Sequence, residues 1–167
     1  MAGLLYQFFT DDHRRLEEFL NQAVADPEEI RPVPYEAFRR GLLKHIGMEE
    51  KILLPTAQQA RDGEPLPMAA KLRLDHAALA ALLVPPPSPQ IIAAIRAILA
   101  DHNRIEESPH GLYDLCEQLG EVDALMAKAR SAPDPGATPH NSDPNVLNRV
   151  RRILAKAGYN FDDYSEK

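Results

Sequence analysis

The sequence has no tryptophan, only one cysteine and no long apolar run among its 167 residues. With Cys116 alone, one chain can form neither a disulfide framework nor a zinc site built on several thiolates. No apolar stretch reaches the roughly 18 residues that a membrane-spanning helix needs. The opening residues, MAGLLYQFFTDDHRR, also lack the basic n-region and the long apolar h-region of a secretory signal peptide. We therefore expect a cytoplasmic protein with no membrane partner.

An excess of positive charge is also absent, because the formal net charge is -6 at pH 7. Proteins that neutralise nucleic-acid phosphates usually carry a basic stripe. The one basic cluster here is short and lies near the C-terminus, at Arg149, Arg151 and Arg152. This charge pattern argues against a nucleic-acid partner.

The alternating β-branched and aromatic residues of strands are missing as well. Apolar residues instead recur at spacings of three and four, which is typical of amphipathic helices. The first helix is predicted to follow an N-cap at Thr10 or Asp11, and the second to start around Pro34 and to bend or end at Pro55. Four core-facing stripes result, and they read His13/Leu16/Leu20/Val24, Phe38/Leu42/His45/Glu49/Ile52, Leu72/His76/Leu79/Leu83 and Ile91/Ile95/Ile98/His102/Glu106.

Short links between these stripes predict an all-α fold, an antiparallel up-down-up-down four-helix bundle over residues 1–130. Pro109 interrupts the fourth helix, and helix is expected to resume through Leu112. Residues 131–145 are rich in proline, serine and aspartate, a linker composition. Residues 146–167 form a C-terminal extension with a short helix, which docks back on the bundle or contacts a second copy or another partner.

Two stretches of the chain carry the same motif, His45 with Glu49 and His102 with Glu106. On a helix, residues four apart lie on one face, so an imidazole and a carboxylate can reach the same metal ion. Taken singly, either motif could equally be a local hydrogen-bonded pair. Two copies in phase with apolar stripes favour a shared site.

Each predicted helix carries one histidine in its core-facing stripe. These histidines are His13, His45, His76 and His102, and together with Glu49 and Glu106 they make six polar groups in an apolar interior. Buried polar groups without partners are costly, so something must satisfy them. Counting residues along the helices at about 1.5 Å each brings three of the four connections to one depth, and the proline-rich link before Ile91 can cover the remaining gap.

Imidazole and carboxylate ligands without thiolate suit iron, manganese or zinc. Two carboxylates from separate helices can bridge two ions, which leaves two histidines for each and open positions for an oxo or hydroxo bridge and an exogenous ligand. A lone histidine such as His76 could instead be a hydrogen-bonded core residue. His110, one turn beyond Glu106, could support a ligand or become an extra one.

Four segments, DDHRRLEEFL, HIGMEEKILLP, LRLDHAAL and ADHNRIEES, resemble in order the four motifs of the hemerythrin-like proteins, the HHE cation-binding domains. The resemblance covers about residues 4–120. It implies a non-haem di-iron centre in which His13 and His45 serve one iron and His76 and His102 the other. Glu49 and Glu106 would bridge the two.

The chain departs from the oxygen-carrying hemerythrins at two positions. Leu72 stands where they place a further histidine, and Glu106 stands where they use aspartate. The resemblance is therefore to the broad HHE group, and it predicts binding or sensing of oxygen, peroxide or nitric oxide more than oxygen carriage.

Two alternatives to this binding role remain open. One is a di-iron enzyme acting on peroxide or nitric oxide, with a proton donor among Tyr6, Tyr113, Glu50, Glu107 and His110. The other is a structural or interaction bundle that holds an adventitious ion. No catalytic residue is assigned, because the ligand set favours a metal-binding protein over a dedicated enzyme.

Overall fold

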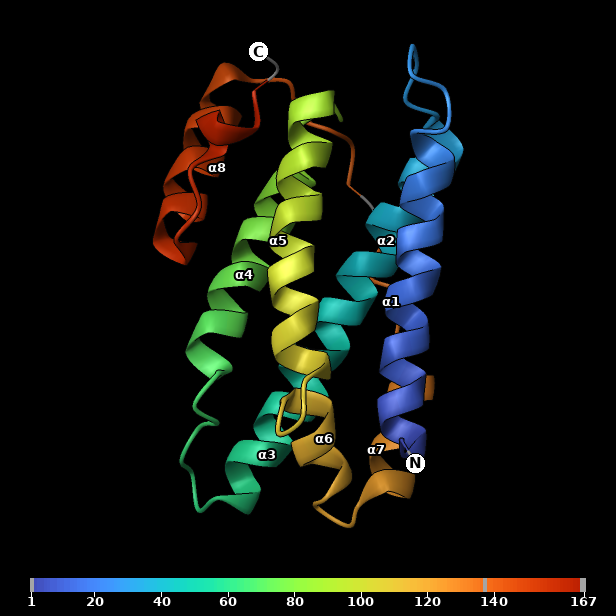
Figure 1. Cartoon of the computed structure of the whole chain (residues 1–167), viewed down its shortest axis with the longest axis vertical. Coiled ribbons are helices and arrows are strands. Elements are labelled where there is room, and N and C mark those ends of the chain that lie inside the picture. The colour runs from blue at the N-terminus through green and yellow to red at the C-terminus, as the bar shows by residue number, and fades with distance from the viewer. Residues whose placement is uncertain (1, 137, 166–167) are drawn as a thin grey trace. The chain divides into compact units, whose positions relative to one another are not determined.

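The computed structural model describes residues 2–136 and 138–165 (Figure 1). These residues are helical and contain no β-strand, which confirms the predicted all-α class. None of their helices is long and apolar enough to cross a membrane. In chain order the elements are α1 Leu4–Ala23, α2 Pro32–Met48, the π-helix η1 Glu49–Leu53, α3 Leu54–Ala60, α4 Ala69–Leu82, α5 Pro89–Glu107, α6 Leu112–Glu117, α7 Val122–Arg130, α8 Pro144–Ala157 and the 3₁₀-helix η2 Phe161–Tyr164.

The chain forms two compact units. The first unit comprises residues 1–69 and 103–137, and the second comprises residues 70–102 and 138–167. The division falls inside α5, between His102 and Asn103, so the one helix contributes to both units.

In the first unit, α1 packs against α2, and the short helices α6 and α7 also pack against α1. Helix α1 buries Leu5, Phe9, Leu16 and Leu20, which lie on one face because they recur every three to four residues. Each such side chain taken out of water contributes about 1.5–3 kcal/mol to folding. His13, Leu16 and Leu20 of the predicted stripe therefore lie on the core face of this helix, whereas Val24 follows its last residue and is only half-buried.

Helix α1 begins at Leu4, so the prediction that it starts after Thr10 or Asp11 is wrong. The side chain of Glu117 accepts a hydrogen bond from the Tyr6 backbone N–H at 3.0 Å and thereby satisfies one of the exposed donors of the first turn. Thr10 lies inside the helix, where its hydroxyl donates to the Tyr6 carbonyl at 2.9 Å. The helix start thus depends on a residue 111 positions away.

Pro55 does not end the second helix. The helix runs on from α2 through the π-helical segment η1 into α3, where Pro55 occupies the first turn. Proline has no N–H to donate and its ring clashes with the preceding turn, and a π-bulge is one way for a helix to accommodate it. Glu49 is the first residue of this π-helical segment.

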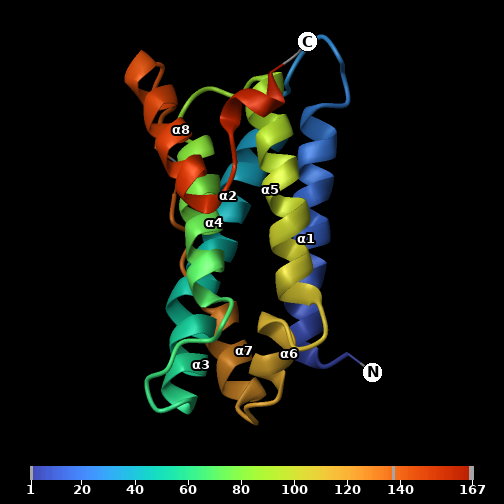
Figure 2. The ribbon, with the colours of Figure 1, turned by 60° about the vertical axis from the view of Figure 1, so that its left-hand side comes forward.

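In the second unit, α4 and the adjoining part of α5 lie side by side, with α8 alongside them (Figure 2). Helix α8 buries Val150, Leu154 and Ala157. The ammonium of Lys71 on α4 donates to the Ala157 carbonyl at 2.7 Å, where α8 ends. The predicted C-terminal helix is therefore present, and it docks on helix α4 of the same chain.

Candidate metal centre

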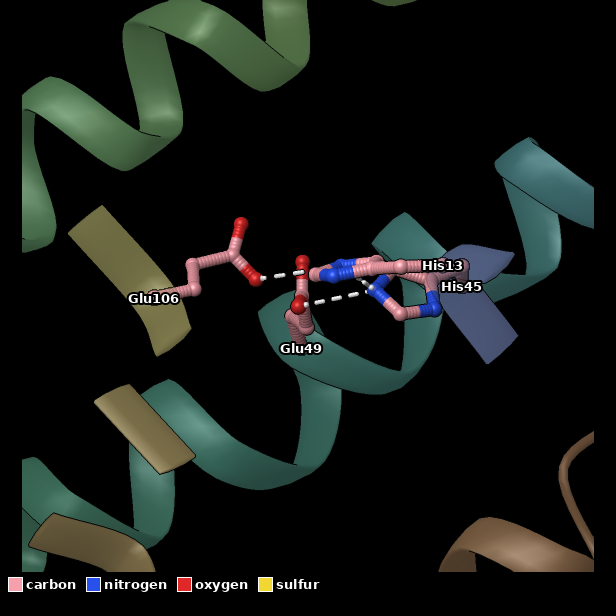
Figure 3. Close-up of side chains that lie close together, drawn as sticks. All are labelled: His13, His45, Glu49 and Glu106. Atoms are coloured by element: carbon pink, nitrogen blue, oxygen red, sulfur yellow. Dashed lines mark hydrogen bonds and ion pairs between the residues drawn. The ribbon is translucent and has the colours of Figure 1, made fainter. Parts of the chain in front are cut away.

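Four of the six predicted ligands meet in the first unit (Figure 3). His13 comes from α1, His45 from α2, Glu49 from the start of η1 and Glu106 from the end of α5. Each offers one ligand atom, and these four atoms all lie within 4.8 Å of one another. All four residues are buried, with at most 8% of any of them exposed. This buried group could hold a metal ion.

The His-x-x-x-Glu spacing brings His45 and Glu49 together as predicted. His45 Nε2 lies 3.0 Å from Glu49 Oε1 and 3.0 Å from His13 Nε2. His13 Nε2 in turn lies 3.7 Å from Glu106 Oε2. The Nε2 atoms of both imidazoles therefore face the same two carboxylates.

The other nitrogen of each ring is held by a carboxylate. His13 Nδ1 donates to Glu107 at 2.6 Å, and His45 Nδ1 donates to Asp12 at 2.8 Å. An ionised carboxylate only accepts hydrogen bonds, so the proton of each neutral imidazole is on Nδ1 and the lone pair is on Nε2. A carboxylate on the far nitrogen is the usual companion of a metal-ligating histidine.

The hydroxyl of Tyr113, from α6, lies among the four ligand atoms. Its oxygen is 2.5 Å from Glu49 Oε1, 2.9 Å from His13 Nε2 and 3.1 Å from His45 Nε2. It also makes a short hydrogen bond to Glu106. The Tyr113 ring is fully buried and stacks on Phe9 with 5.0 Å between the ring centroids.

Five electron-pair donors thus converge at this point, and with neutral imidazoles they share one proton, that of the phenol. Lone pairs facing one another at 3 Å in a buried site repel unless positive charge is added. Extra protons can supply that charge, and so can a metal cation. The donor set therefore fits a cation of the kind bound by nitrogen and oxygen ligands.

The pKa values of the site agree with this electrostatic picture. Burial by itself would lower the pKa of His45, but the carboxylates of Glu49, Asp12 and Glu106 outweigh it and raise that pKa to about 10. Burial, together with the same two glutamates, raises the pKa of Tyr113 well above its ordinary value. The pocket therefore favours positive charge on the imidazole of His45 and disfavours negative charge on the oxygen of Tyr113.

The remaining two predicted ligands lie together in the second unit. The rings of His76 on α4 and His102 on α5 have centroids 4.7 Å apart, and each residue is only 3% exposed. His102 Nδ1 donates to Asp75 at 3.2 Å, and Asp75 is fully buried. Lys71 Nζ donates to the other oxygen of Asp75 at 2.7 Å. His102 is therefore held by a carboxylate in the same way as His13 and His45.

Sequence reasoning did not predict the contacts of Asp12 and Asp75 with the histidines, and it named Glu107 only as a candidate proton donor and not as the partner of His13. A signal for the aspartates was present, because three of the six histidines directly follow an aspartate: Asp12-His13, Asp75-His76 and Asp101-His102. In the first two cases the aspartate binds the histidine of another helix, not its own neighbour. His110, which was a candidate supporting group, has an 84% exposed side chain on a residue with φ of 63°, and its Nδ1 lies 3.9 Å from the carboxylate of Asp114.

Comparison with known proteins identifies no relative of this chain. No family model matches it, and neither does any curated protein or solved structure. The resemblance to the hemerythrin-like family therefore stays a prediction, and the candidate site rests on the donor atoms of this chain alone.

Proposed function

We propose that this chain is a metal-binding protein of the hemerythrin-like type, with a carboxylate-bridged di-iron centre that binds or senses oxygen, peroxide or nitric oxide. The observation that carries the proposal is the convergence of five buried electron-pair donors at one point. The carboxylates that bind His13 Nδ1 and His45 Nδ1 support it, because they fix each lone pair on the inward nitrogen.

In this proposal His13 and His45 hold one ion, His76 and His102 hold the other, and Glu49 and Glu106 each give one oxygen to either ion. Two facts support a shared role for the second pair. Helix α5 carries His102 and Glu106 one turn apart, and Asp75 binds His102 as Asp12 binds His45. Manganese or zinc would fit the same ligands.

The bundle prediction belongs to this proposal too. An antiparallel up-down-up-down arrangement of α1, α2 with its extension α3, α4 and α5 would turn all four histidine stripes toward one interior. Iron bound there would supply an open coordination position and redox chemistry for a small ligand. The partner we propose is thus a small molecule, and neither a nucleic acid nor a membrane.

Tyr113 has a specific role in the proposed centre. Its oxygen lies 2.5 Å from Glu49 Oε1 and 2.9 Å from His13 Nε2, which is close enough for all three atoms to bind one ion. It would therefore become a ligand of the ion held by His13 and His45. Deprotonation of this buried phenol, which its raised pKa opposes, would be driven by the cation. A phenolate bound to ferric iron gives a charge-transfer absorption in the visible, which would be lost when the phenol oxygen is removed.

The first test is metal content with an optical spectrum. Full-length protein from iron-replete cells should hold about two iron ions per chain, bound through the mixed nitrogen and oxygen donors described above. Tyr113→Phe should keep the iron and lose the visible absorption, since the ring remains and only the oxygen is removed. A chain that stays metal-free in iron, manganese and zinc alike would falsify the proposal.

A second experiment separates binding from catalysis. The reduced protein is exposed to air, peroxide or nitric oxide and followed optically. Reversible ligand binding or a single oxidation supports a binder or sensor. Steady turnover of peroxide would instead favour the enzymatic alternative, with the Tyr113 hydroxyl as the proton donor that its position beside Glu49 makes available.

A further inference from the structure

The first unit also contains a pocket whose lining includes none of the candidate metal ligands. It has a volume of about 330 Å³, near the lower end of the range for small-molecule sites. Leu43 and Met48 of α2 and Ile52 of η1 line it with apolar surface. Ser131, Ala132, Pro133 and Pro135, which follow α7, also line it.

The charge of the pocket contrasts with that of the chain. Three lysines line it, Lys44 on α2, Lys51 on η1 and Lys128 on α7, and none of its lining residues is acidic. Lys44 pairs with the exposed Asp134 at 3.3 Å. Lys51 and Lys128 are exposed and form no ion pair with any residue in 2–136 or 138–165. The pocket therefore has a positively charged rim, although the net charge of the chain is -6.

We propose that this pocket binds the anion of a medium-chain fatty acid. The alkyl chain would displace water from Met48, Ile52 and Leu43, and the carboxylate would lie between the ammonium groups of Lys51 and Lys128. Both parts of the ligand are needed, because an exposed ion pair is worth little alone and apolar contact in a small open pocket is weak without an anchor.

Gly47 offers a way to close the pocket without disturbing the fold. It lies on α2 in the pocket lining, and no atom outside its own helix lies within 4 Å of the position that a Cβ would take. Leucine at this position would extend into the space proposed for the alkyl chain. Leucine also has the better helix propensity, so the variant should be at least as stable as the original protein.

The test is a calorimetric titration of the full chain with octanoate. Two control ligands separate the contribution of the alkyl chain from that of the charge. Octan-1-ol has the chain without the charge, and inorganic phosphate has charge without the chain. Octanoate should bind saturably at one site, and both controls should bind at least tenfold more weakly. Equal binding of octan-1-ol, or no saturable binding of octanoate, would overturn the proposal.

Three variants locate the site. Gly47→Leu should abolish the saturable binding while retaining its melting temperature, and Lys51→Met with Lys128→Met should weaken it about tenfold. Lys156→Met, an exposed lysine of α8 outside the pocket, should change nothing. Unchanged binding in Gly47→Leu would place octanoate elsewhere. Association with acidic phospholipid vesicles, without binding of free octanoate, would mean that the lysines form a membrane-binding patch, and it would overturn the proposed fatty-acid site.

Discussion

The two units contain helix pairs built in the same way, α1 with α2 and α4 with α5. In each pair the earlier helix carries an Asp-His dipeptide, and the later helix carries a histidine whose Nδ1 donates to that aspartate. The residues are Asp12, His13 and His45 in the first pair and Asp75, His76 and His102 in the second. The two histidine rings are 4.6 Å apart in one pair and 4.7 Å apart in the other.

The pairs differ in what holds the aspartate. Asp12 is bound by Arg15, whose guanidinium is 50% exposed and lies 2.7 Å away on the same helix. Asp75 is bound by Lys71, whose ammonium also binds the Ala157 carbonyl and lies 4.5 Å from the centre of the Tyr159 ring. The first pair is therefore supported locally, whereas the second is connected to the C-terminal extension.

The largest effect is expected from Glu49→Gln. This change removes a negative charge from the centre of the first group and one of the two proposed bridging ligands. We expect iron to fall from about two ions per chain to well below one, because both ions would lose a ligand. Metal analysis of purified protein measures this directly.

Glu64→Gln is the matched control, since Glu64 is an exposed residue of the same unit. It should retain all the iron. If Glu49→Gln lost only one ion, the two histidine pairs would bind metal independently. They would then be two separate metal sites and not one bridged centre.

The second expected effect is a loss of stability of the metal-free protein at alkaline pH. The folded-state pKa of His45 is raised to about 10 from an ordinary value of 6.5. Between these values the folded chain holds a proton that the unfolded chain has released. The stabilisation is therefore complete below about pH 6.5 and is lost as the pH rises toward 10, with a slope on the order of 1 kcal/mol per pH unit.

Melting temperatures of metal-free protein between pH 6 and pH 10 test this slope. Asp12→Asn should flatten it, because Asp12 is one of the groups that raise the pKa of His45. Iron-loaded protein should also show little slope in this range, because a cation would then occupy the place of the proton. A slope that is equally steep with and without metal would mean that the His45 pair binds no ion.

The sequence predicted that His45 and Glu49 come together because the cause of this contact is local. His45 and Glu49 lie one turn apart on one continuous helix, so spacing alone puts their side chains on one face. The histidine stripes follow from the same periodicity. The all-α class was predictable for this reason as well.

The parts that the sequence did not predict depend on contacts between distant residues. Glu117 caps α1, and Tyr113 reaches His13 across 100 positions, so neither contact is encoded in a local pattern. The π-helical segment that begins at Glu49 and precedes Pro55 is also not predicted by spacing rules. The aspartates were visible as dipeptides, but their partners lie on neighbouring helices.

A smaller effect is expected when the aspartates are changed singly to asparagine. Asparagine retains the size and an acceptor oxygen but loses the charge. Each change should therefore lower the affinity for one ion by about ten- to a hundredfold. Asp12→Asn should lower the affinity for the ion that the Tyr113 oxygen would bind, whose visible absorption reports on it. Asp75→Asn should lower the affinity for the other ion and leave that absorption in place. Stepwise iron titrations followed optically distinguish the two.

Asp101→Asn is the control for both aspartate changes. Asp101 directly precedes His102 but is exposed, whereas Asp75 is fully buried. We expect iron affinity to be unchanged. If it fell as far as in Asp75→Asn, surface charge would explain the effect and the hydrogen bond to His102 would not.

The smallest effect is expected from Lys71→Met, which tests the difference between the two pairs. Burial would lower the pKa of Lys71, but its hydrogen bond to Asp75 raises it, so the ammonium stays charged. Its loss leaves Asp75 bound to His102 and removes the bond to the end of α8. Because Lys71 is partly exposed, we expect about 1 kcal/mol of destabilisation, a fall of roughly 2–4 °C in Tm, and a severalfold loss of affinity at the His76 and His102 pair.

Arg15→Met is the corresponding change in the first unit, and it should leave the exchange of α8 amide hydrogens as it is. Lys71→Met should accelerate that exchange, because the Ala157 carbonyl loses its partner. If iron affinity stays constant while α8 loosens, Lys71 is only a helix cap. If both change together, the C-terminal extension and the proposed metal ligand His102 are coupled through one ammonium group. Metal binding at His102 would then alter the docking of α8 to the same extent that α8 alters metal binding.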